Sequence, residues 1–128
     1  MRHAMEVRHS TFEDPKFIDL LRAHNIAMVV ADTAGKWPVI EDLTADFVYV
    51  RLHGDEELYV SGYTDEALDM WAAKVRPWLK GRQCKDARTF GKNIPALGCG
   101  RDVYVYFDND VKVRAPFDAM SLAEKLDS

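Results

Sequence analysis

The chain has no apolar run near the roughly 20 residues that a membrane-spanning helix needs, and its first residues lack the apolar core of a secretory signal. It also has no internal repeat and no low-complexity tract, which excludes solenoid and disordered classes. The formal net charge is −4, so the strongly basic surface typical of nucleic-acid binding is absent. These absences predict a soluble, cytoplasmic protein with no membrane partner, and they argue against a nucleic-acid partner.

Cofactor motifs are equally scarce. The two cysteines, Cys84 and Cys99, fall in one expected loop without the further Cys or His ligands of a zinc site, so they are expected to be free thiols. Residues 35–36 are Gly-Lys but lack the flanking glycine and Ser or Thr of a phosphate-binding loop. Residues 108–110 lack the glycine and glutamate of a calcium loop. The cofactor, if any, is therefore unknown from the sequence.

Two strand-like runs, residues 46–54 and 102–110, are the most informative features present. In each run one face is aliphatic, formed by Val48, Val50 and Leu52 and by Val103, Val105 and Phe107. The other face is polar or aromatic, formed by Tyr49, Arg51 and His53 and by Tyr104, Tyr106 and Asp108. This alternation predicts strands with helices outside and a polar pocket inside.

The remaining elements follow an α/β order. Further strands are expected at residues 4–8 and 26–31, and helices at 14–23, at 64–79 and from Pro116 onward. Asp14-Pro15, Thr64 and Gly81 supply the expected starts and stop of the first two helices. We therefore predict a single domain over residues 1–128, with parallel strands, outer helices and a loop insertion at 82–101.

Several motifs, in order along the chain, resemble the YecE-like family, a domain of unknown function. They are residues 6–9 (EVRH), 32–38 (DTAGKWP), 49–54 (YVRLHG), 59–63 (YVSGY), 106–110 (YFDND) and 115–119 (APFDA). The resemblance implies a TIM-type barrel with a polar pocket at the carboxyl ends of the strands. It implies no particular reaction.

The resemblance covers only the C-terminal half of the family barrel. A complete barrel needs about 250 residues and eight strands, whereas this sequence has 128 residues and about four strong strands. We expect either a fragment, or a mis-started reading frame, or a true half-barrel. Because a half-barrel exposes two strand edges, we expect a homo-oligomer, or a partner chain that completes the barrel, rather than a monomer.

The residues expected at the strand ends define a candidate site. Catalytic roles fall to His53, Glu6 and Asp108, and ligand binding to Arg8, Arg51, Asp32, Asn109, Trp37 and Tyr59. The two arginines would bind a small anionic or phosphate-bearing ligand. The imidazole and carboxylates would transfer protons, which makes hydrolase-type chemistry the first expectation if the protein is an enzyme.

Three other interpretations stay open. The charged residues Glu6, Arg8, Arg51 and Asp108 form an ion network that only fixes the strand register. Alternatively, a metal ion is bound by His9, Asp32, His53 and Asp108. The third alternative is a non-catalytic binding module that associates with itself or with a missing half-barrel.

Overall fold

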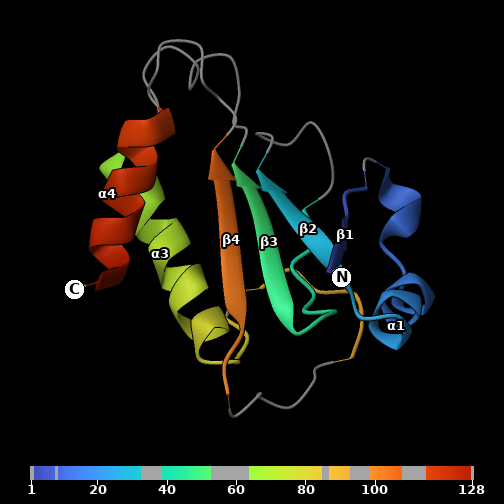
Figure 1. The fold of residues 1–128 in the computed structure, drawn as a ribbon. Coiled ribbons are helices and arrows are strands. Elements are labelled where there is room, and N and C mark those ends of the chain that lie inside the picture. The colour runs from blue at the N-terminus through green and yellow to red at the C-terminus, as the bar shows by residue number, and fades with distance from the viewer. Residues whose placement is uncertain are drawn as a thin grey trace.

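The computed structural model describes residues 2–7, 9–32, 39–52, 64–84, 87–92, 99–107 and 115–127. They form a four-stranded parallel sheet in the order β1-β2-β3-β4, with helices packed on one face (Figure 1). The elements are β1 (His3–Met5), the 3₁₀ helix η1 (Ser10–Phe12), α1 (Pro15–Ala23), β2 (Ile26–Asp32), β3 (Phe47–Leu52), α3 (Asp65–Leu79), β4 (Asp102–Phe107) and α4 (Ala115–Asp127). The predicted α/β class with parallel strands and outer helices is confirmed.

The helices begin and end where local sequence signals predict. Asp14 caps α1 by accepting a hydrogen bond from the amide of Lys16 at 2.8 Å, with Pro15 at the first helical position. Thr64 caps α3 in the same way through the amide of Ala67. After α3 the chain turns at Gly81, whose φ of 80° is readily adopted by glycine.

The aliphatic residues of the strands point toward the helices. Val48, Val50 and Leu52 of β3 are buried in one core cluster with Trp71 and Trp78 of α3. A second cluster joins α1 to β2. The prediction that the aliphatic face of β3 meets helices, leaving Arg51 on the other side, is confirmed.

Other details of the predicted packing are wrong. β1 is shorter than residues 4–8 and is exposed along its length. On α4, the apolar spacing predicts an inner face of Ala119, Leu122, Ala123 and Leu126; Leu122 is buried, while Ala119 and Ala123 are exposed. Among the described residues, β1 is an outermost strand of the sheet and has a strand neighbour on one side only (Figure 1).

Two buried carboxylates tie the segment after β2 to the segment after α3. Asp42 accepts hydrogen bonds from the amides of Phe90 and Gly91, each at 2.8 Å. Glu41 accepts a hydrogen bond from the amide of Arg88 at 3.3 Å and also forms an ion pair with Lys74 of α3 at 2.7 Å. The described parts of residues 82–101 contain no helix or strand, and the hydrogen bonds to Glu41 and Asp42 fix the segment at Arg88, Phe90 and Gly91. Within the described ranges, no helix has both the length and the apolar character to cross a membrane.

Candidate functional site

The face of the sheet opposite to the helices, called the inner face below, carries the polar and aromatic residues of the strands. On β3 these are Tyr49 and Arg51, whose register partners on β4 are Tyr104 and Tyr106. Both β4 tyrosines are exposed. The register partner of Arg51 on β2 is Ala31, whose methyl side chain leaves space above the sheet.

An ion pair crosses this space. Nη1 of Arg51 lies 2.9 Å from both carboxylate oxygens of Glu6, the residue that follows β1. The side chains of Arg51 and Glu6 are 29% and 17% exposed, so the pair is shielded from bulk water but still reachable from the inner face. The carboxylate fixes the position of the guanidinium through charge-assisted hydrogen bonds. Two residues of the predicted site are thus brought together from strands that are not neighbours.

A second arginine–carboxylate contact lies at the opposite, amino-terminal end of the inner face. Arg2 donates from Nη1 to Asp102 at 3.0 Å and to the hydroxyl of Tyr104 at 2.7 Å. Its guanidinium also lies over the ring of Phe47, 5.1 Å from the centroid. The hydrogen bond to Asp102 raises the pKa of Arg2. Because Arg2 precedes β1 and Asp102 begins β4, this contact also brings the two outer strands of the sheet together over its inner face.

Two other residues named in the sequence analysis have different surroundings from those expected. Asp32, at the end of β2, is level with Leu52, which belongs to the helix-side core. The register therefore places Asp32 on the face opposite to Arg51. His9 caps the 3₁₀ helix η1, with its Nδ1 3.1 Å from the amide nitrogen of Thr11. Its observed role is local and structural.

The other predicted site residues lie outside the described part of the chain. These are His53, Asp108, Arg8, Asn109, Trp37 and Tyr59. Their assignment to the site stays a prediction.

Arg101 is a buried charged residue that no sequence motif marks. Its guanidinium is buried and donates hydrogen bonds to the carbonyl oxygens of Ala45 at 3.0 Å and Gly81 at 2.7 Å. Burial lowers the pKa of Arg101. A lone arginine before a strand carries no signal of such a role, because both acceptors are backbone atoms from distant segments.

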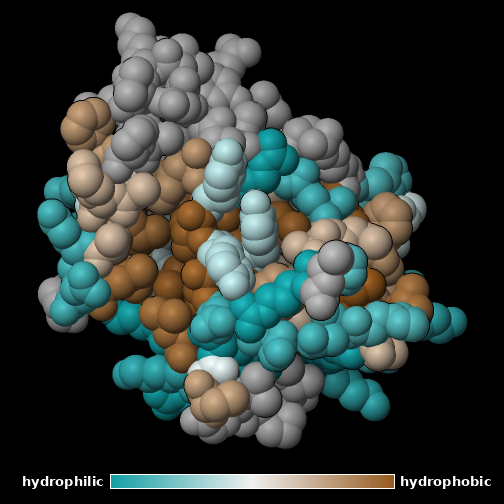
Figure 2. Space-filling model, in the orientation of Figure 1, coloured by the Kyte–Doolittle hydropathy of each residue, from teal (hydrophilic) through white to brown (hydrophobic). Residues whose placement is uncertain are grey.

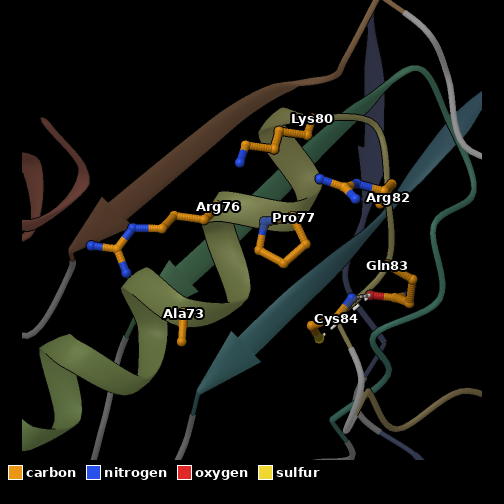
Figure 3. Close-up of a pocket in the computed structure, with 7 residues that line it drawn as sticks. All are labelled: Ala73, Arg76, Pro77, Lys80, Arg82, Gln83 and Cys84. Carbon is orange, nitrogen blue, oxygen red and sulfur yellow. Dashed lines mark hydrogen bonds between the residues drawn. The ribbon is translucent and has the colours of Figure 1, made fainter. Parts of the chain in front are cut away.

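Two cavities lie at the amino-terminal end of the sheet, away from the ion pair between Glu6 and Arg51. One, of about 310 Å³, is lined by Arg22, Asn25, Leu43, Thr44, Ala45, Asp46 and Arg101. The other, of about 440 Å³, lies on the outer side of α3 (Figure 3) and is lined by Ala73, Arg76, Pro77, Lys80, Arg82, Gln83 and Cys84.

The larger cavity carries three cations, but they do not converge on a common point. Arg76 extends away from Gln83 and Cys84 (Figure 3), and its Nη2 donates to the carbonyl oxygen of Lys125. The cavity also lies at the carboxyl end of a helix, where the helix dipole disfavours an anion. We therefore do not regard it as the candidate site.

The described residues contain no group of three or more His, Cys, Asp or Glu side chains that could hold a metal ion. Both cysteines are free, with Cys84 buried and Cys99 exposed, as predicted. The remaining candidate site is the inner face near the ion pair between Arg51 and Glu6.

Comparison with known proteins gives the family. Residues 1–128 match the family described as "Protein of unknown function DUF72", and the chain therefore belongs to this YecE-like (DUF72) family, as its motifs predict. None of the curated proteins compared with the chain matches it significantly.

Solved structures similar to the chain are DUF72 family proteins. One, from Thermotoga maritima, is 23% identical with a TM-score of 0.74. Another, from Enterococcus faecalis, is 15% identical with a TM-score of 0.66. All of this chain is covered in both comparisons, but only 47% and 49% of those chains. The chain thus spans about half the length of the solved structures it resembles, and at these identities the likeness concerns the fold alone.

Proposed function

We propose that the inner face binds a small anionic ligand, bearing a phosphate or carboxylate group, near the carboxyl ends of the strands. The observation that carries the proposal is the ion pair between Arg51 and Glu6. In open parallel α/β sheets, ligands bind outside the carboxyl ends of the strands. Arg51 lies one residue before the end of β3, on the face without helices.

The chemistry of the pair suits such a ligand. A guanidinium presents its N–H donors in a planar fork that matches carboxylate and phosphate oxygens. Glu6 acts as a positioning residue, because it fixes Arg51 and reduces the conformational entropy that a ligand would otherwise have to remove. Tyr106, level with Arg51 on β4, adds an exposed phenol beside the guanidinium.

A catalytic form of the proposal adds His53 and Asp108, which follow β3 and β4 in the sequence. Proton transfer by these groups to an ester or anhydride held by Arg51 would be hydrolase chemistry. This step depends on residues outside the described part of the chain, so it ranks below ligand binding.

The test is a titration of the ¹⁵N-labelled chain with inorganic phosphate at constant ionic strength, with chloride as the reference anion. Backbone signals around Arg51 should shift and saturate. Arg51→Ala should weaken binding about tenfold or more, because a hydrogen bond to a charged group contributes about 1.5–3 kcal/mol. Arg51→Lys should lose part of this affinity, because the planar fork is lost while the charge stays.

Arg2→Ala is the matched control. Arg2 is also paired with a carboxylate on the inner face, but at the opposite end. Its removal should leave phosphate binding unchanged. The proposal is wrong if phosphate shifts the signals of Arg51→Ala and Arg2→Ala equally and Arg51→Ala changes only the free energy of unfolding. The pair of Arg51 and Glu6 is then a structural ion pair.

A further inference from the structure

The two outer strands of the sheet each have an open edge. In the order β1-β2-β3-β4, β1 and β4 have a strand neighbour on one side only within the described chain (Figure 1). The outer edge of each strand presents backbone N–H and C=O groups that can pair with another strand. Because all four strands are parallel, the edge of β4 can accept a β1 strand in the same parallel pattern that joins the strands within the sheet.

The β4 side of the molecule also leaves apolar surface uncovered. Val103, Val105 and Phe107 are only partly buried, although they belong to the same core cluster as the fully buried residues of β3. On α4, Phe117 and Met120 are 55% and 56% exposed. Figure 2 shows hydrophobic surface gathered over the region of α3, α4 and β4.

Phe117 and Met120 are three residues apart and share one face of α4. This face is turned away from the buried Leu122, which packs in the cluster with α3. It therefore faces the side of α4 on which the sheet has no further strand or helix among the described residues. We call Phe117, Met120 and the half-buried residues of β4 the β4 flank.

The β1 side carries a matching surface. Met5 on β1, Phe12 in η1 and Leu20 on α1 are exposed, Leu20 by 55%. Met5 lies on β1 itself, and Phe12 and Leu20 belong to the two helices that follow β1 in the chain. We call these three residues the β1 flank.

The two outer strands of the sheet are also linked over its inner face. Arg2 precedes β1, yet its guanidinium reaches Asp102 and Tyr104 of β4 across the inner face. A concave inner face brings the two outer strands within reach of such a contact. A concave parallel sheet with two open edges is the geometry of half a barrel.

We propose that a second copy of this chain closes the sheet, with the β4 flank of each copy packed on the β1 flank of the other. A two-fold axis parallel to the strands keeps all eight strands parallel and uses both edges at once, so the assembly stops at two copies. Pairing of β4 with β4 would instead leave both β1 edges open.

The test is the mass in solution of the 128-residue chain, measured by light scattering after size exclusion over a range from low to several hundred micromolar. The expected result is a mass twice that of the chain, with a reversible monomer at the lowest concentrations. A monomer at all concentrations, or a ladder of larger species, would overturn the proposal.

Met120→Glu tests the interface itself, with Met70→Glu as its control. Met70 is also an exposed methionine, 46% exposed on α3, and it belongs to neither flank. Met120→Glu should weaken dimerisation at least tenfold, whereas Met70→Glu should leave it unchanged. Far-ultraviolet circular dichroism checks that both variants fold. A dimer that both variants leave equally intact would show that another surface forms it.

Discussion

Strands β3 and β4 carry the same alternation of aliphatic and polar residues, but the structure buries them to different degrees. Val50 of β3 is fully buried, whereas Val105, its register partner on β4, is only partly buried. On the inner face, Tyr49 of β3 is partly buried and Tyr104 beside it is exposed. The difference follows from position, because in the described part of the chain β3 has a strand on each side and β4 has one on a single side.

The two strands also start differently. Before β3, the amide of Asp46 donates to the side chain of Asn25, which has a φ of 53°. Before β4, Gly100 has a φ of 78° and passes beneath the end of α3. Equal patterns along a strand therefore do not imply equal energetic roles, since the roles depend on what lies beside each strand.

The largest effect is expected at the start of β4. A Cβ on Gly100 would lie 2.3 Å from the carbonyl oxygen of Leu79, and its positive φ strains any side chain. Gly100→Ala should lower the free energy of unfolding by at least about 3 kcal/mol. Urea unfolding followed by tryptophan fluorescence measures this change.

Gly100→Asn separates the two causes. Asparagine tolerates positive φ better than alanine does, but it has the same Cβ. If the contact with Leu79 dominates, both variants lose comparable stability. A Gly100→Asn variant as stable as the native chain would contradict the close approach of β4 to α3.

A smaller effect compares the two strands directly. Val50→Ala removes two buried methyl groups and should cost about 2 kcal/mol. Val105→Ala removes the same groups from a half-covered position and should cost about 1 kcal/mol or less. Equal losses of unfolding free energy, measured at a concentration where the chain is monomeric, would contradict the difference in burial.

Much of this fold could be predicted from local sequence signals. The caps at Asp14 and Thr64 and the alternation in β3 depend on residues close together in the chain, so their consequences are local. The exposure of Ala119 and Ala123 on α4 could not be predicted. Periodicity identifies an apolar stripe, but it does not say whether a neighbour covers the stripe.

The candidate site was predicted less completely, for a similar reason. Arg51 was placed correctly on the inner face because alternation within a strand decides the face. Asp32 was not placed on the correct face. Its neighbours are set by the register between β2 and β3, which aligns it with Leu52. The contact between Arg2 and Asp102 joins residues 100 positions apart. Neither residue shows by itself that the curvature of the sheet brings them together.

The smallest expected effect concerns the helix that covers β4. Nζ of Lys125 on α4 lies 2.7 Å from Asp69 of α3, and this hydrogen bond raises the pKa of Lys125 above 10.5. Because the pKa is higher in the folded state, the contact stabilises the fold fully below pH 10.5. The stabilisation is lost as the pH rises through the folded-state pKa. Methyl NMR of the chain between pH 7 and 12 should therefore show shifts at Val105, while Val50 beneath α3 stays constant. Lys125→Gln should abolish the shift at Val105. Equal shifts at Val50 and Val105 would mean that loss of the contact between Lys125 and Asp69 affects the whole core and not β4 in particular.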